Sequence, residues 1–329
     1  MLKVKEYKME KNKDLLSENY AENITLSKKP SKESFFGLLF DTIRGFFIGI
    51  AFIIPGFSGG SVAAILGIYE KLVSAIADLF SDFKRSVKTL LPIMIGLIIG
   101  AVSLLYPLGY FIEAYPFPTV SLFVGLAIGG IPSITSSIKS SLKGVHLLSF
   151  LIPCVFALSL SFIPALADKA LCPLSFTQAL SLVAVGFIGS CALVIPGISG
   201  SMLLLILGFY NPIINIVTDN LFKGINVGNS VLVLALLAMG IGCGFIIISK
   251  IMKVLLAKCP TGCYVAILGF IIGSLPTVYI STAKEAGYTS ESVPTDAPTY
   301  IVCIALLLIG IMLSLGAILI LRKRNKKSA

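Results

Sequence analysis

The sixteen residues Ile54-Pro-Gly-Phe-Ser-Gly-Gly-Ser-Val-Ala-Ala-Ile-Leu-Gly-Ile-Tyr69 decide the fold, because the chain contains this stretch twice. The second copy is Ile195-Pro-Gly-Ile-Ser-Gly-Ser-Met-Leu-Leu-Leu-Ile-Leu-Gly-Phe-Tyr210, which aligns without a gap at an offset of 141 residues. Nine of the sixteen positions are identical. A duplicated motif of this length predicts a chain built from two related halves.

Each copy is predicted to interrupt a helix. Proline cannot donate a backbone amide and glycine reaches backbone angles that other residues avoid, so a Pro-Gly pair ends a helix. Ser58 or Ser61 is expected to cap the next helix by accepting a hydrogen bond from its free first-turn amides. Broken backbone at membrane depth persists only where it is buried in protein or lines a cavity. Matching interruptions in two halves therefore point to a substrate site.

The composition predicts a polytopic membrane protein. The 329 residues are 56% hydrophobic and only 13% charged, with a mean hydropathy of +0.97. These values exclude a soluble globular domain. The seven cysteines lie mostly in apolar runs and the single histidine, His146, lies at a loop edge. We therefore expect no disulfide, no metal site and no cofactor.

Ten apolar segments follow a polar N-terminal region, and most reach the roughly 20 residues that cross a bilayer. They cover residues 36–54, 60–80, 89–110, 117–138, 145–166, 176–195, 200–218, 229–250, 262–282 and 300–321. The repeat extends beyond the motif, because Gly125–Pro132 matches Gly269–Pro276 at an offset of 144. Segments one to four thus pair with segments six to nine. Segment five crosses once between them, which predicts an inverted repeat.

The predicted fold is an all-α polytopic membrane protein with an inverted structural repeat and re-entrant, broken helix hairpins. The predicted parts are a disordered cytoplasmic tail (1–34), membrane repeat 1 (35–140), a linking transmembrane helix (141–175), membrane repeat 2 (176–282), an outer loop with the last transmembrane helix (283–321) and a basic cytoplasmic tail (322–329).

The charge distribution predicts the orientation. With this layout, the face that carries both termini collects 21 of the 26 Lys and Arg residues. The opposite face holds only Lys169, Lys223 and Lys284. Under the positive-inside rule both termini are cytoplasmic. The net charge of +10 therefore reflects topology, and nucleic acid is not an expected partner.

The first broken pair is predicted to re-enter the membrane from the cytoplasm. Uninterrupted apolar sequence runs only from Gly45 to the break and from Ser61 to Tyr69, with charged residues at both ends. Arms of about ten residues, at 1.5 Å each, reach only the middle of the bilayer. The second pair has longer apolar arms, and its sequence leaves open whether it re-enters or spans.

Two helix ends that meet near the midplane would present free amides to an anion such as phosphate or carboxylate. Alternatively, the glycines and serines only allow tight helix packing, as we expect for Gly45/Gly49 and Gly96/Gly100. Duplication together with the Pro-Gly break favours the anion site. Its candidate residues are Arg44, Pro55, Gly56, Ser58, Gly59, Gly60, Ser61, Tyr69, Glu70, Pro196, Gly197, Ser199, Gly200, Ser201 and Tyr210.

Four of these candidates have a second interpretation. Arg44 is either a functional charge near the membrane centre or an interfacial partner of Asp41. Glu70, whose counterpart is Asn211, either carries a proton or pairs with Lys71. Tyr69 and Tyr210 either contact a headgroup or are ordinary interfacial tyrosines.

These motifs resemble the bacterial polyprenyl-phosphate transporter family, the PopT-like undecaprenyl-phosphate translocases. The resemblance covers roughly residues 36–282 and rests on Pro55–Gly60 with Gly67–Glu70, on Pro196–Ser201 with Gly208–Tyr210, and on Gly269–Pro276. It implies a flippase that returns undecaprenyl phosphate from the outer to the cytoplasmic leaflet for cell-wall synthesis. Many family members have an acidic residue three positions before the first motif proline. This chain has Phe52 there, so that position cannot carry a proton.

The leading hypothesis is therefore a lipid-phosphate translocase rather than an enzyme, with polyprenyl phosphate as partner and protons as a candidate coupling ion. The alternative is a transporter or channel for a small soluble anion. A membrane phosphatase would need a nucleophile, an acid and clustered cations, which the apolar segments do not supply. The sequence leaves the oligomeric state, the coupling ion and the transport direction open.

Overall fold

The computed structural model describes residues 35–53, 58–138, 142–164, 166–168, 171, 174–198, 200–216, 224, 226–285, 287 and 296–328. The chain divides into two units, residues 1–41 and 42–329, with the boundary inside the first helix. The predicted tail 1–34 and the site candidates Pro55, Gly56 and Ser199 lie outside the described residues.

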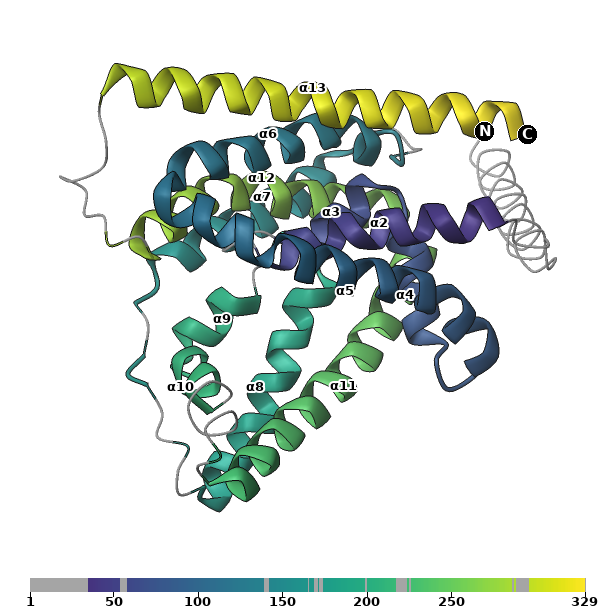
Figure 1. Cartoon of the computed structure of the whole chain (residues 1–329). Helices are drawn as coiled ribbons and strands as arrows, with labels where there is room; N and C mark the ends of the chain where they lie inside the picture. Colours follow the sequence, from purple (N-terminus) through teal and green to yellow (C-terminus); the bar gives the residue numbers. More distant parts are fainter. Residues whose placement is uncertain are drawn as a thin grey trace. The chain divides into compact units, whose positions relative to one another are not determined.

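The described residues form helices joined by turns, with no strand among them, which confirms the all-α fold class (Figure 1). The helices are α2 (Phe35–Ile53), α3 (Gly59–Ile65), α4 (Tyr69–Ala77), α5 (Phe83–Ala114), α6 (Pro116–Thr135), α7 (Gly144–Ser159), the 3-10 turn η1 (Leu160–Phe162), α8 (Phe176–Val194), α9 (Gly200–Ile206), α10 (Tyr210–Asn215), α11 (Val227–Lys258), α12 (Pro260–Glu285) and α13 (Ala297–Ser328).

Within the described residues, six helices are long and apolar enough to cross a membrane, so about ten is wrong as a count of spans. These six are α5, α6, α7, α11, α12 and α13. The four remaining predicted segments belong to the two broken pairs. Their second members, predicted as the single segments 60–80 and 200–218, are each two short helices of six to nine residues.

Glycines bring the backbones of two helix pairs into contact. A Cβ built on Gly45 of α2 or Gly96 of α5 would lie 2.1 or 1.9 Å from a carbonyl oxygen of the other helix. The same holds for Gly186 of α8 and Gly240 of α11, at 2.5 and 2.2 Å. These residues match Gly45 and Gly96 at offsets of 141 and 144. Gly45 and Gly96 are therefore packing residues, as predicted.

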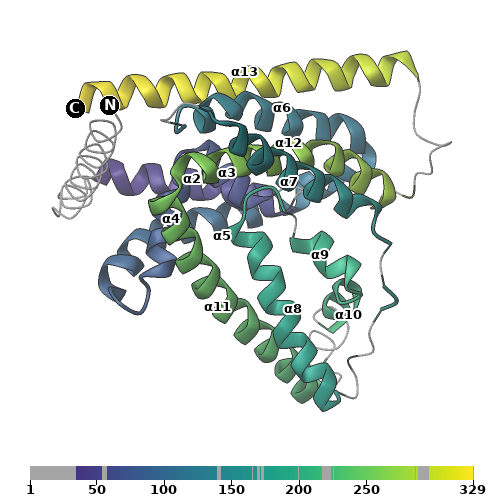
Figure 2. The ribbon, with the colours of Figure 1, turned by 180° about the vertical axis from the view of Figure 1, so that it is seen from behind.

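The helix that follows each repeat packs on the last helix of the other repeat: α13 packs on α6, and α7 packs on α12. Gly125 of α6 faces the Leu307 carbonyl oxygen of α13, and Gly269 of α12 faces the Phe150 carbonyl oxygen of α7, at 2.1 and 2.2 Å from an added Cβ. Both views show α13 lying along α6 (Figures 1 and 2). These contacts extend the correspondence between the halves to α7 and α13, which the sequence comparison did not pair.

A glycine turn divides the short helices of each motif. Gly67 and Gly208 have φ values of +70° and +72°, a left-handed conformation that favours glycine. In the first copy the amides of Gly67 and Ile68 donate to Ala64 and Ala63. In the second copy the same two bonds recur 141 residues later (Gly208 to Leu205 and Phe209 to Leu204). We call α3–α4 (59–77) hairpin 1 and α9–α10 (200–215) hairpin 2.

Candidate functional site

Two buried hydroxyls lie at the start of α3. The amides of Ser61 and Val62 donate to the Ser58 carbonyl oxygen, at 3.0 and 3.3 Å. The Ser58 side chain makes no cap hydrogen bond, and neither Oγ of Ser58 nor Oγ of Ser61 has a partner. Their residues are only 5% and 3% exposed, and Gly59 and Gly60 are buried beside them. The predicted cap is therefore wrong.

A buried hydroxyl without a hydrogen bond costs about 1–3 kcal/mol, so this position favours a polar ligand or water. The hydroxyls can act together with the backbone amides of Gly59 and Gly60, the first two residues of α3, which have no partner within the helix. With only seven residues, α3 has a small dipole, so hydrogen-bond donors rather than the dipole define the site. Such donors suit an oxyanion.

The second motif begins where α8 ends. The Ile195 amide closes the last turn of α8 by donating to the Cys191 carbonyl oxygen at 2.7 Å, and Pro196 and Gly197 follow, both buried. Gly197 has a φ of +88°, and a Cβ there would lie 2.6 Å from the backbone of Phe270. Only glycine fits this position. Gly200 then begins α9, with Ser201 in its first turn.

Tyr69 joins the two motifs. Its hydroxyl donates to the Val194 carbonyl oxygen at 2.9 Å, and the residue is only 2% exposed. Val194 immediately precedes the second motif, so the end of the first copy contacts the beginning of the second. The Tyr69 hydroxyl proton is therefore engaged by Val194, although the sequence had suggested Tyr69 as a contact for a headgroup.

Two further links hold hairpin 1 to the second half of the chain. Glu70 lies in the first turn of α4, is exposed, and accepts a hydrogen bond from the Tyr264 hydroxyl at 2.6 Å. Asp78, which follows α4, pairs with Lys253 of α11 at 2.5 Å. Sequence reasoning missed both partners, because each lies more than 170 residues from the carboxylate that it contacts.

Two other candidates, Arg44 and Tyr210, lie outside the cluster that Ser58, Ser61 and Tyr69 form. Arg44 is half-buried on α2, nine residues before Ile53 and hence about 14 Å along the helix axis. Tyr210 begins α10 and is 36% exposed. Beside it, the Asn211 side-chain amide donates to a carboxylate oxygen of Asp168 at 3.2 Å. Hairpin 2 is thus tied to the preceding loop.

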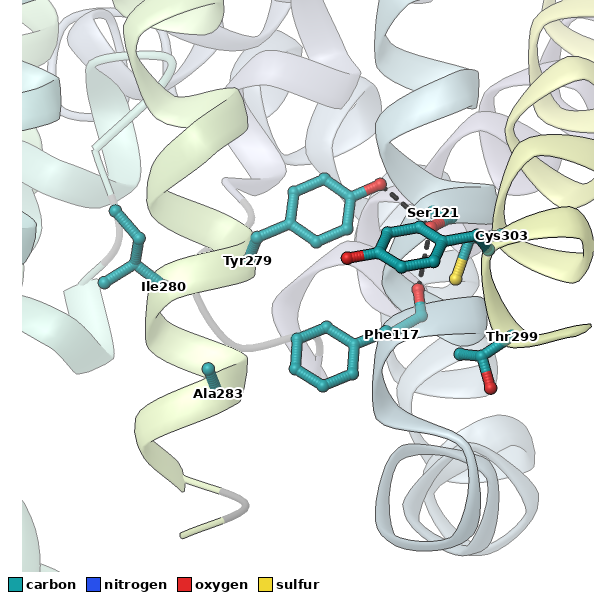
Figure 3. Close-up of a pocket in the computed structure, with 8 residues that line it drawn as sticks. Phe117, Ser121, Tyr279, Ile280, Ala283, Thr299 and Cys303 are labelled. Atoms are coloured by element: carbon teal, nitrogen blue, oxygen red, sulfur yellow. Dashed lines mark hydrogen bonds between the residues drawn. The ribbon is translucent and has the colours of Figure 1, made fainter. Parts of the chain in front are cut away.

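A separate cavity of about 450 Å³ lies among α6, α12 and α13 (Figure 3). Aromatic side chains line it, including Phe117 and Tyr279, and the Tyr279 hydroxyl bonds Ser121 at 2.8 Å. None of its lining residues is charged. It offers apolar contacts and lacks the cations of a typical phosphate site.

Residues 48–294 match the model of a family described as VCA0040-like, undecaprenyl phosphate translocase-like. The match begins in α2, contains both motifs and runs beyond the end of α12. The chain belongs to this family. It is also 30% identical to a polyprenyl-phosphate transporter of Staphylococcus aureus (strain NCTC 8325 / PS 47) over 286 residues, which cover 83% of this chain and 93% of that protein. No solved structure matches the chain.

Proposed function

We propose that this protein moves polyprenyl phosphate from the outer to the cytoplasmic leaflet and holds the phosphate where the two motifs meet. One observation carries the site: the hydroxyls of Ser58 and Ser61 are buried without partners at the start of α3. Tyr69, at the end of the same motif, contacts the residue that precedes the second motif. The family match and the name of the Staphylococcus relative support the substrate class.

The proposed architecture is an inverted repeat. Three candidate spans, α5, α6 and α7, separate hairpin 1 from α8, and an odd number of crossings places α8 on the opposite face from α2. Helices of six to nine residues are about 9–14 Å long, so neither member of a hairpin can cross a hydrocarbon core of about 30 Å. Both broken pairs, α2 with hairpin 1 and α8 with hairpin 2, would therefore re-enter, one from each face, with the first pair entering from the cytoplasm.

The charge of the substrate sets an energetic requirement. A phosphomonoester carries about −1.5 to −2 charges. Moving it inward against about 100 mV costs about 2.3 kcal/mol per charge, hence about 3.5–4.6 kcal/mol. Neutralisation by Arg44 or proton uptake at Glu70 would offset this cost. The polyprenyl tail would remain in lipid beside the hairpins.

The test is translocation of fluorescently labelled polyprenyl phosphate by the reconstituted protein. Replacing both motif serines, Ser58→Leu with Ser199→Leu, should stop translocation by filling the site. Ser58→Ala with Ser61→Ala should slow it at least tenfold, because a charge-assisted hydrogen bond contributes about 1.5–3 kcal/mol. Ser249→Ala is the matched control, since Ser249 on α11 also has a buried hydroxyl without a partner but lies outside both motifs.

The two serine variants and the control give a clear decision. Unchanged translocation in Ser58→Leu with Ser199→Leu would refute the site. Equal loss in Ser249→Ala would show that any buried hydroxyl matters, and would also refute it. Excess inorganic phosphate should leave lipid transport unchanged, whereas displacement at similar concentrations would favour a carrier of small soluble anions.

A further inference from the structure

We infer that the cavity among α6, α12 and α13 is a receiving site for polyprenyl phosphate in the outer leaflet. The cavity holds the part of the polyprenyl chain next to the phosphate, and Lys284 binds the phosphate before it moves to the motif site. This inference rests on the proposed function, which supplies the substrate and the orientation. It adds a second binding site, whose residues belong to neither motif.

The cavity lies where its three helices begin or end on one face. Phe117 is in the first turn of α6, Ala283 in the last turn of α12 and Thr299 in the first turn of α13. In the proposed orientation α5 crosses outward from the cytoplasm, so this is the outer face. Tyr300, which forms part of the wall, is 51% exposed, so the cavity borders the surroundings of the protein. Lipid of the outer leaflet therefore reaches it directly.

The lining of the cavity suits an apolar chain. The rings of Phe117, Tyr279 and Tyr300 form much of its wall, and Figure 3 shows the first two facing it from α6 and α12. The Tyr279 hydroxyl donates to Ser121, and the Ser121 hydroxyl donates to the Phe117 carbonyl oxygen, both at 2.8 Å. A cavity whose polar atoms are paired in this way favours an apolar ligand over water. Its volume of about 450 Å³ takes only part of a long polyprenyl chain, whose methyl branches fill more of it than a straight acyl chain would.

Lys284 supplies the positive charge that the cavity itself lacks. It lies one helical turn beyond Ile280, which lines the cavity, so the two side chains are neighbours on α12. Its ammonium donates to the Ser161 carbonyl oxygen at 2.6 Å, and because an ammonium has three donors it can also bind a phosphate oxygen. Within the part of the outer face that the structure describes, Lys284 is the one basic residue. The acidic Asp296 accepts the amide and hydroxyl of Thr299, so the first turn of α13 partly balances its charge.

The depth of Lys284 matches a lipid headgroup. Phe270 of α12, which touches Gly197 of the second motif, precedes Lys284 by fourteen residues, hence by about 21 Å along the helix axis. Half of the hydrocarbon core is about 15 Å thick, so Lys284 lies at headgroup level when the motifs lie near the midplane. Between these levels, Leu275 packs both on the core that contains Ile65 of hairpin 1 and on the apolar cluster beside the cavity. The receiving site is therefore distinct from the motif site and continuous with it in packing.

The experiment measures binding by fluorescence, because the chain contains no tryptophan. Phe117→Trp places a reporter in the cavity, and Phe176→Trp, at an 85% exposed position that begins α8, is the matched control. Each variant is reconstituted in nanodiscs and titrated with polyprenyl phosphate, polyprenol, phosphatidic acid and inorganic phosphate. We expect polyprenyl phosphate to shift the emission of the Phe117→Trp variant at lower concentrations than the other three compounds, and to leave the emission of the Phe176→Trp variant unchanged.

Further substitutions, made together with Phe117→Trp, separate the headgroup contact from the chain contact. Lys284→Gln should weaken binding of polyprenyl phosphate about tenfold, because it removes a charge-assisted hydrogen bond, and should leave polyprenol binding unchanged. Lys284→Arg should restore most of the affinity. Lys258→Gln, at an exposed lysine that ends α11 on the cytoplasmic side, should change neither. Ala283→Leu should weaken the binding of both lipids equally by filling the cavity.

Three results would overturn the inference: equal affinity for phosphatidic acid, an equal response of the Phe176→Trp control, or unchanged affinity for polyprenyl phosphate in Lys284→Gln. The titration is also independent of the motif site, because Ser58→Leu with Ser199→Leu should stop translocation and leave binding at the cavity unchanged. Normal translocation without a fluorescence response would refute the receiving site alone. Binding at the cavity without translocation by the parent protein would refute the transport proposal alone.

Discussion

Hairpin 1 and hairpin 2 share their local geometry but differ in their surroundings. Both have a left-handed glycine at the turn and the same pair of capping bonds. Hairpin 1 is buried and linked to α8, α11 and α12, whereas hairpin 2 is partly exposed and tied to the loop before α8. The difference shows that the motif sets the shape of the turn, and that partners distant in the sequence set how firmly each hairpin is held.

The largest expected effect separates the two turn glycines. Gly67→Ala should lower stability by about 1–2 kcal/mol, the cost of a left-handed alanine, because no atom lies within 4 Å of the added Cβ. Gly208→Ala should cost about 1–3 kcal/mol more, because its Cβ would lie 2.4 Å from the Ala167 carbonyl oxygen. Thermal unfolding in detergent measures both, and equal losses would show that hairpin 2 is not packed on its loop.

The next effect compares equivalent apolar residues of α4 and α10. Val73 is fully buried, so Val73→Ala should destabilise the protein by about 2 kcal/mol. Its counterpart Ile214 is exposed, and Ile214→Ala should change stability by about 0.5 kcal/mol or less. The same unfolding assay applies. A larger loss for Ile214→Ala would reverse the assignment of the tighter hairpin.

A smaller effect concerns the polar residue after each tyrosine. Asn211→Asp would place a second carboxylate against Asp168 and loosen hairpin 2 at neutral pH by about 0.5–1 kcal/mol, since the site is exposed. Like charges raise the pKa of one member of such a pair. The loss should therefore disappear at acid pH, because protonation of either carboxyl removes the repulsion between them. Glu70→Gln keeps an acceptor for Tyr264 and should not show this pH dependence.

The smallest effect concerns the ion pair that hairpin 1 has with α11. The Lys253 and Asp78 side chains are 42% and 39% exposed, so Lys253→Gln should cost no more than about 1 kcal/mol. Salt screens exposed charges, so the difference between variant and parent should shrink at 1 M salt. A difference that persists at high salt would indicate a buried, more strongly stabilising contact.

The sequence predicted the features that depend on neighbouring residues. The break after Val194 follows from the Pro196-Gly197 pair, and the contact glycines Gly45 and Gly96 follow from their spacing. It did not predict the turn at Gly67, because a glycine within an apolar run is also compatible with a continuous helix. The composition of the apolar runs also did not indicate that the helices on either side of that turn are short.

The partners of hairpin 1 could not be predicted, for a different physical reason. Tyr264 and Lys253 reach it only through the packing of α12 and α11, which depends on the whole fold. The sequence also did not show that α7 corresponds to α13. The glycines of α6 and α12 contact backbone carbonyls, here of Leu307 and Phe150, so the facing side chains need not be alike.

The pairing of α6 with α13 has a consequence for biosynthesis. Gly125 of α6 is translated about 180 residues before Leu307, whose carbonyl oxygen covers it. While the second half is still being synthesised, the surface of α6 at Gly125 lacks its contact with α13 and must face lipid or an insertion factor. Assembly of the first half is therefore completed only by a helix that is synthesised after α2–α12, and a nascent chain stalled before α13 would expose an unfinished groove to the quality-control machinery.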